Sequence, residues 1–265
     1  MDLLPSPAAV VPGALTVWVA LVAAFTVLWA ASLPLKNASI VDMWWGPAFL
    51  LAWAVYASRQ PALSPRAAVV GLLVAAWALR LAWHIGRRNV GHGEDPRYVT
   101  WRVQYGRSWW WFSWVKVFLL QATVAWVVSW PLGAAVAGAA SFPGPLDALG
   151  LLLTAGGLIV EATADAQLRR FKATAPRGAV CDVGLWRYSR HPNYFGEAVV
   201  WWGLWCFAAD VRGGWITVLS PAIMTWLLVR VSGVAMLEPA LLASKPAYAE
   251  YVRRTSAFVP RPPRD

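Results

Sequence analysis

The stretch GLWRYSRHPNYFGE, residues 184–197, is a polar centre in a chain that is otherwise apolar. Pro192 suits the first turn of a helix, because the N–H group that proline lacks would have no partner there. A helix that begins at Pro192 places Asn193 and Glu197 four residues apart on one face. Its N-terminus favours an anion such as a phosphate. Three basic side chains lie just before that helix: Arg187, Arg190 and His191.

A simpler interpretation of this stretch is a solvated basic loop that only obeys membrane topology. That interpretation leaves unexplained why an amide and a carboxylate, Asn193 and Glu197, stand inside the apolar segment that follows. We therefore treat residues 184–197 as the centre of a candidate site.

Composition predicts the class of protein. Apolar residues make up 59% of the 265 residues and charged residues 14%, and the mean hydropathy is +0.50. Together with several long apolar runs, these values indicate a polytopic helical membrane protein. The 20 tryptophans suit anchoring at a membrane interface. The net charge of +10 lies mainly in connecting loops, as topology requires, so we expect no nucleic-acid partner.

Seven apolar stretches near the ~20 residues of a bilayer crossing predict an all-α bundle in one membrane domain, residues 1–265. They are residues 10–32, 38–58, 67–86, 109–132, 146–168, 192–209 and 214–236. The sixth is the shortest. The remainder, 238–265, is expected to be a tail with a short surface helix broken at Pro246, followed by a proline-rich end.

The loops predict the orientation. Arginine and lysine concentrate in residues 87–107, in residues 169–190 and in the tail, whereas the opposite loops hold only Arg59, Arg66 and Arg212. The positive-inside rule then places the basic segments and the C-terminus in the cytoplasm and the N-terminus outside, in a bacterial inner membrane. Cys181 and Cys206 show no metal-ligand spacing, so no metal site is expected.

Ionisable residues inside membrane spans cost ~2.5–3.5 kcal/mol on insertion scales, so each is a site hypothesis. Glu161, Asp165 and Arg169 repeat every four residues on the fifth stretch. Arg80 and His84 do so on the third. With Asn193 and Glu197, these groups are expected to converge on one cavity that faces the cytoplasm. The alternative is that they pair with one another and only lock the bundle.

Residues 184–197 resemble the signature of the steroid 5-alpha-reductase-like membrane family, in its bacterial branch. The tail sequence AYAEYVRRTSAFVP, residues 247–260, resembles the C-terminal end of that family. The segments SIVDMWWG, residues 39–46, and GEDPRY, residues 93–98, also look typical of the bacterial branch. The His-Pro-Asn-Tyr-x-Gly core is shared with sterol C14 reductases, so it indicates a superfamily and not a substrate.

The resemblance implies an NADPH-dependent reductase of an activated C=C bond in a lipidic substrate that is sterol-, isoprenoid- or enone-like. It implies seven transmembrane helices and a cofactor that enters from the cytoplasm. By matched position, Asn193 and Glu197 would contact the nicotinamide end or its ribose. Other implied cofactor contacts come from the fifth span, the stretch before Pro192 and the tail: Asp165, Arg169, Arg187, Arg190, His191, Tyr251 and Arg254.

The second span departs from the family pattern, because it lacks the Gln-Glu pair with which steroid 5-alpha-reductases grip an enone carbonyl. Asp42 is the nearby carboxylate, and His84 falls near the position of the family's tyrosine on the third span. A 3-keto steroid is therefore not expected. His84 and Asp42 are the candidate catalytic residues, as groups that polarise a carbonyl and donate a proton.

Two other classes compete with a reductase. Isoprenylcysteine-type carboxyl methyltransferases of the same superfamily carry an Arg-His-Pro-x-Tyr stretch and bind S-adenosylmethionine. Asn193 after the proline, with Gly196 and Glu197 closing the motif, resembles the reductases more closely. A non-enzymatic lipid-binding membrane protein would keep the bundle and need no cofactor.

Overall fold

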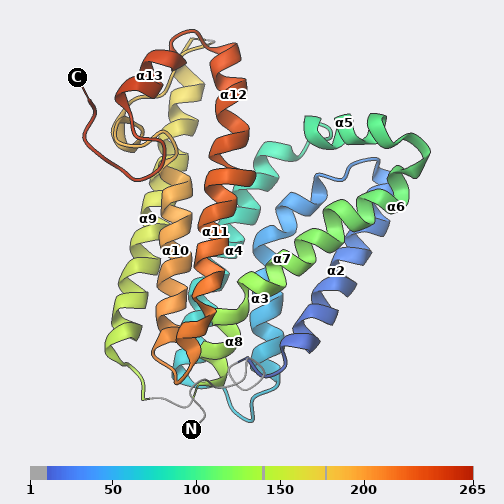
Figure 1. The fold of residues 1–265 in the computed structure, drawn as a ribbon, viewed down its shortest axis with the longest axis vertical. Coiled ribbons are helices and arrows are strands. Elements are labelled where there is room, and N and C mark those ends of the chain that lie inside the picture. The colour runs from blue at the N-terminus through green and yellow to red at the C-terminus, as the bar shows by residue number, and fades with distance from the viewer. Residues whose placement is uncertain (1–10, 139–140, 177, 265) are drawn as a thin grey trace. The chain divides into compact units, whose positions relative to one another are not determined.

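The computed structural model describes residues 11–138, 141–176 and 178–264. Every regular element within these ranges is a helix (Figure 1), which confirms the all-α prediction. Six helical segments are long and apolar enough to cross a membrane: Ala14–Leu35, Ile40–Ser58, Pro65–Asn89, Pro96–Ala137, Pro145–Thr174 and Gly214–Ser244. The predicted start of the first span, at residue 10, lies outside the described residues.

The helix α10, Pro192–Ala209, has 18 residues and is not among these six segments. The predicted count of seven spans therefore stays a prediction. The start of α10 at Pro192 agrees with the position predicted from the missing N–H group of proline.

The chain forms two compact units. Unit 1 comprises Met1–Gly144 and Phe207–Thr217, and unit 2 comprises Pro145–Cys206 and Val218–Asp265. Each unit is described by itself below.

Unit 1 contains the helices α2 to α8 and most of the short η4. Their bounds are α2 (Ala14–Leu35), α3 (Ile40–Ser58), α4 (Pro65–Asn89), α5 (Pro96–Tyr105), η1 (Gly106–Ser108), α6 (Trp109–Ser113), η2 (Trp114–Leu119), α7 (Leu120–Val128), α8 (Trp130–Ala137) and η4 (Gly214–Val218). The helices α3 and α4 pack closely, since a Cβ atom on Gly46 would lie 2.6 Å from the carbonyl oxygen of Ala78.

Two elements of unit 1 differ from the sequence prediction. The helix α4 extends to Asn89, beyond the predicted end at residue 86, and Arg87 and Arg88 in its last turn suit the negative end of the helix dipole. The helix α5 stands where a loop was predicted. Asp95 caps it, because its side chain accepts a hydrogen bond from the backbone N–H of Arg97.

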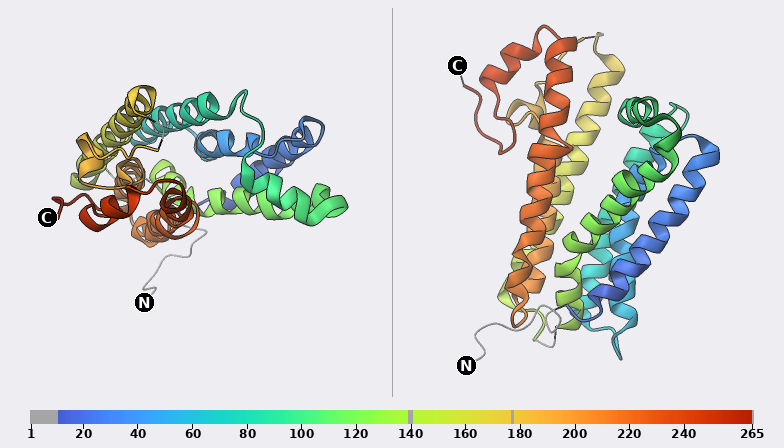
Figure 2. Two further views of the ribbon diagram at one scale, coloured as in Figure 1. Left: turned by 90° about the horizontal axis from the view of Figure 1, so that it is seen from above. Right: turned by 45° about the vertical axis from the view of Figure 1, so that its right-hand side comes forward.

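Unit 2 contains α9, α10 and the C-terminal helices. Their bounds are α9 (Pro145–Thr174), η3 (Gly184–Arg187), α10 (Pro192–Ala209), α11 (Leu219–Trp226), η5 (Leu227–Val231), α12 (Val234–Ser244) and α13 (Tyr248–Arg254). The long helices run side by side (Figure 2). The tail helix ends at Ser244 and resumes at Tyr248, so it is interrupted around Pro246 as predicted.

The contact between α9 and α10 depends on glycine. A Cβ atom on Gly157 would lie 2.6 Å from the carbonyl oxygen of Gly196, and one on Gly203 would lie 2.4 Å from the hydroxyl of Thr154. Small residues let membrane helices approach closely. This approach brings the first turn of α10 beside the middle of α9, and α13 and the tail gather at the same end of unit 2 (Figure 1).

Candidate functional site

The turn before α10 is fastened to α9. Gly184 has a φ of +60°, a left-handed conformation that favours glycine, and a Cβ atom there would displace the end of the Gln167 side chain. The Gln167 side-chain oxygen accepts the backbone N–H of Leu185 at 2.9 Å. The indole of Trp186 donates to the carbonyl of Ala164 at 2.9 Å. The contacts of residues 184–186 with α9 therefore position the backbone of the basic residues that follow.

Arg190 is buried and engaged on two sides. Its Nε and Nη2 atoms donate to both carboxylate oxygens of Glu238 on α12, at 2.7 and 3.0 Å. Its Nη1 atom donates to the carbonyls of Thr255 and Val252, at 2.6 and 3.1 Å. Because a guanidinium has five N–H groups, these four bonds leave one. Arg190 thus ties the start of α10 to α12 and to the tail, and its predicted contact with a phosphate stays a prediction.

His191 shares the same carboxylate. Its Nε2 atom lies 3.2 Å from Glu238, and its ring stacks on Tyr194 with the planes 6° apart. The backbone N–H of His191 donates to the hydroxyl of Ser189, which in turn donates to the carbonyl of Phe258. Glu238 is a site residue that sequence reasoning did not select. The signal for it is the basic Arg-His pair, but sequence spacing alone does not choose among several carboxylates.

Asn193 and Asp165 are in contact, which fits both a shared site and the alternative that such groups pair to lock the bundle. The amide nitrogen of Asn193 donates to Asp165 Oδ1 at 3.2 Å. Since an ionised carboxylate only accepts, the NH₂ end of the amide faces Asp165 and its oxygen faces the other way. That oxygen, Asn193 Oδ1, is buried and has no hydrogen-bond partner among the described residues.

Two further carboxyl groups are buried close by in sequence. Glu161 is one helical turn before Asp165 on α9, and Glu197 is one turn after Asn193 on α10; they are 2% and 7% exposed. Acidic residues are rarely so buried in apolar surroundings. The α9–α10 contact therefore holds an unusual concentration of acceptors.

Tyr251 and Arg254 come from α13. The hydroxyl of Tyr251 donates to the carbonyl of Trp186 and lies 3.3 Å from the carbonyl of Ser189. Burial raises the pKa of Tyr251 well above its ordinary value, so the hydroxyl keeps its proton and remains a donor. Arg254 is half exposed and lies 3.7 Å from Asp182. The expected cofactor residues Arg169 and Arg187 have exposed side chains.

The candidate catalytic residues Asp42 and His84 belong to unit 1. Asp42 accepts the hydroxyl of Tyr98 at 2.8 Å and the guanidinium of Arg97 at 3.0 Å. Arg97 also pairs with Asp95 at 2.8 Å. His84 is partly buried on α4. The expected convergence of these two residues with the cofactor residues stays a prediction.

The part of the chain that the structure describes contains no set of side chains arranged to bind a metal ion. No group of three or more His, Cys, Asp or Glu side chains there could hold an ion. Cys181 and Cys206 are buried free thiols. Burial raises the pKa of the Cys181 thiol above its ordinary value.

The fold and this site define a helical membrane protein whose polar centre, a turn followed by a helix, is held by the C-terminal tail. Residues 28–255 match the family described as "Protein of unknown function (DUF1295)", and the chain belongs to this family. It is similar to the uncharacterised protein C594.04c of Schizosaccharomyces pombe. The two are 28% identical over 266 residues, which cover 89% of this chain and 76% of that relative. No solved structure matches the chain.

Proposed function

We propose that this protein is an NADPH-dependent membrane reductase that acts on an activated C=C bond of a lipidic substrate. The observation that carries the proposal is the buried oxygen Asn193 Oδ1, which has no hydrogen-bond partner among the described residues. A buried acceptor without a partner costs about 1–3 kcal/mol. A ligand that brings an N–H or O–H group to this oxygen would recover that cost.

The residues present fit the cofactor that the steroid 5-alpha-reductase-like resemblance implies. A carboxamide N–H or a ribose hydroxyl supplies the donor that Asn193 Oδ1 lacks. Asp165 holds the amide of Asn193 in that orientation, through the 3.2 Å bond. Buried carboxylates at Glu161 and Glu197 suit ribose hydroxyls, which can donate to them.

When bound, NADPH supplies a hydride, and the chain supplies binding, orientation and a proton. Asn193 and Asp165 orient the ligand. Tyr251 and Arg190 keep the tail against the start of α10, through bonds to Trp186, Val252 and Thr255. His84 and Asp42 are the candidates for polarising a substrate carbonyl and supplying the proton. For Asp42, that role requires its bonds to Tyr98 and Arg97 to loosen.

The proposal includes an orientation in a bacterial inner membrane with the C-terminus in the cytoplasm, where NADPH is available. The basic loops and tail support it. A reporter that is active only in the cytoplasm, fused to the C-terminal end, should be active. An active periplasmic reporter at the same place would reverse the orientation.

Binding of the purified full chain in lipid nanodiscs tests the function. Calorimetric titrations with NADPH, NADH and S-adenosylmethionine should show saturable binding of NADPH. Asn193→Ala should weaken that binding by roughly 3–10-fold, because it removes one hydrogen bond worth about 0.5–1.5 kcal/mol. The matched control is Gln104→Ala, which removes an amide at an exposed position of α5 and should leave binding unchanged.

Two results would overturn the proposal. Saturable binding of S-adenosylmethionine without any response to NADPH would assign the site to a methyltransferase. Binding of none of the three ligands, with the chain folded, would favour a lipid-binding protein without a cofactor.

A further inference from the structure

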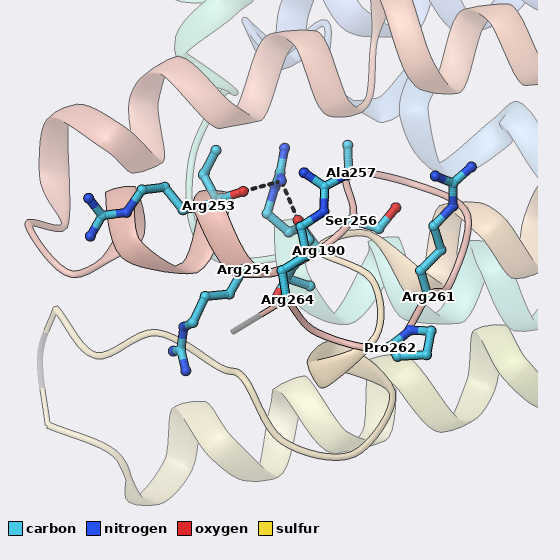
Figure 3. Close-up of a pocket in the computed structure, with 10 residues that line it drawn as sticks. Arg190, Arg253, Arg254, Ser256, Ala257, Arg261, Pro262 and Arg264 are labelled. Carbon is cyan, nitrogen blue, oxygen red and sulfur yellow. Dashed lines mark hydrogen bonds between the residues drawn. The ribbon is translucent and has the colours of Figure 1, made fainter.

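A second polar feature of unit 2 lies outside the α9–α10 contact. The tail encloses a pocket of about 470 Å³ that is lined by Arg190 and by residues from Val252 to Arg264 (Figure 3). Five of the ten described lining residues are arginines, and none of the ten is a carboxylate: Arg190, Arg253, Arg254, Arg261 and Arg264. The volume lies in the range of ligand pockets, ~300–1,000 Å³.

The pocket has a fixed backbone. The backbone N–H of Arg190 donates to the carbonyl of Ser256 at 2.8 Å, and that of Arg261 donates to Tyr188 at 3.0 Å. The N–H of Arg264 donates back to the carbonyl of Arg254 at 2.9 Å, which closes the tail into a loop. Figure 3 shows Arg190 within this loop, bonded to two tail carbonyls. These hydrogen bonds hold in place the backbone of the tail segment that carries the arginines.

The described carboxylates near the pocket pair with only three of its five arginines. Glu238 neutralises Arg190, and Glu250 and Asp182 lie beside Arg253 and Arg254. Within the described residues, no carboxylate lies within ion-pair distance of Arg261 or Arg264. Among the described residues, carboxylates therefore pair with Arg190, Arg253 and Arg254, whereas Arg261 and Arg264 are free to contact a ligand.

We propose that this tail pocket binds a phosphate ester, with Arg261 and Arg264 as the principal contacts. Guanidinium groups form paired, charge-assisted hydrogen bonds to phosphate oxygens, and the hydroxyl of Ser256 on the pocket wall adds a further donor. The ester comes either from the headgroup of an anionic phospholipid or from the ribose phosphate of a dinucleotide. Only the second source rests on the proposed function.

Hydrogen–deuterium exchange of residues 252–264 in the full chain tests the pocket. The first arm compares nanodiscs that contain phosphatidylglycerol with nanodiscs made of phosphatidylcholine alone. In the other, phosphatidylcholine nanodiscs receive NADP⁺, NAD⁺ or inorganic phosphate. Protection of the tail by phosphatidylglycerol identifies a lipid headgroup, and protection by NADP⁺ but not NAD⁺ identifies the dinucleotide. Protection by inorganic phosphate supports the shared chemistry.

Variants make the test specific. Arg261→Gln with Arg264→Gln should abolish the protection, or weaken the affinity of the protecting ligand by about 10-fold or more, since charged hydrogen bonds are worth about 1.5–3 kcal/mol each. The matched control is Arg107→Gln with Arg212→Gln, two exposed arginines of unit 1. The proposal is overturned if no phosphate-bearing probe protects the tail, or if the two double variants behave alike.

These results separate the pocket from the proposed function. If NADPH binding depends on Asn193 but no phosphate-bearing probe protects the tail, the phosphate-site proposal is rejected and the reductase proposal is retained. If phosphatidylglycerol protects the tail but NADPH does not bind, the phosphate-site proposal is retained and the reductase proposal is rejected.

Discussion

Each unit buries one arginine against a carboxylate, and the surroundings of the two pairs differ. In unit 1, Arg66 is 1% exposed and donates to Asp210 at 2.8 Å and to the carbonyl of Ser141 at 2.9 Å. The space around that pair is filled, since a Cβ atom on Gly144 would lie 2.2 Å from Asp210. In unit 2, the Arg190–Glu238 pair borders the tail pocket.

The difference shows what a buried ion pair does and does not indicate. Both pairs join segments far apart in sequence, 144 residues for Arg66 and Asp210 and 48 for Arg190 and Glu238. Removing one partner of such a pair is costly because it leaves a buried charge uncompensated, and this cost arises whether or not a ligand binds nearby. In unit 2, the groups proposed to contact ligands are neighbours of the pair: Asn193 on one side and the tail arginines on the other.

The largest effect is expected from removing either arginine. Arg190→Met and Arg66→Met each remove the guanidinium partner of a carboxylate, and each should lower the free energy of unfolding by about 3–5 kcal/mol. Denaturant unfolding in micelles measures this loss. Only Arg190→Met should also speed hydrogen exchange across residues 252–264, because only Arg190 holds tail carbonyls. Equal exchange of the tail in both variants would contradict the role of Arg190 in holding the tail.

An intermediate effect is expected where α9 and α10 touch. Gly157→Ala places a methyl group 2.6 Å from the carbonyl of Gly196 and should cost about 1–3 kcal/mol through overpacking. It should also weaken NADPH binding, because α10 carries Asn193. The matched control is Gly156→Ala, whose Cβ meets nothing within 4 Å. Thermal unfolding and calorimetry of both variants test this, and similar losses in the two would refute a close contact there.

The smallest effect is expected from Tyr251→Phe, which removes the hydroxyl that donates to Trp186. The loss should be about 1 kcal/mol near neutral pH. Burial raises the pKa of folded Tyr251, so its contribution is fully present below the unfolded value of ~10 and is lost as the pH rises above it. The difference between wild type and variant should therefore shrink above pH ~10 in denaturant unfolding. A constant difference from pH 7 to 11 would contradict this assignment.

The sequence predicted the local features of the fold well. Pro192 marked the start of α10, and its missing N–H group gave the reason. Six of the seven predicted apolar runs coincide with helical segments long and apolar enough to cross a membrane, because a bilayer crossing sets the length of an apolar run. The spacing of Asn193 and Glu197 placed both on α10, and Asp165 lies in contact with Asn193, although their shared role in a site stays a prediction.

Long-range partners were beyond sequence reasoning. Arg66 was assigned to a loop as a topology signal, whereas it is buried in the first turn of α4 and paired with Asp210. Glu238 was not selected from the sequence, although it contacts both Arg190 and His191. Tertiary packing selects one carboxylate among several, and spacing along the chain contains no information about that choice.

The contacts of Arg190 with Glu238 and with the carbonyl of Thr255 also have a consequence for biosynthesis. Glu238 follows Arg190 by 48 residues, and Thr255 follows it by 65. At synthesis rates of ~5–20 residues per second, Arg190 leaves the ribosome roughly 2–10 s before its first charged partner. During that interval its charge lies at the mouth of an inserting apolar helix without compensation. We therefore expect the N-terminal end of α10 to stay at the water boundary during that interval, and the turn that carries His191 and Asn193 to be completed only after the segment containing α12 has been made.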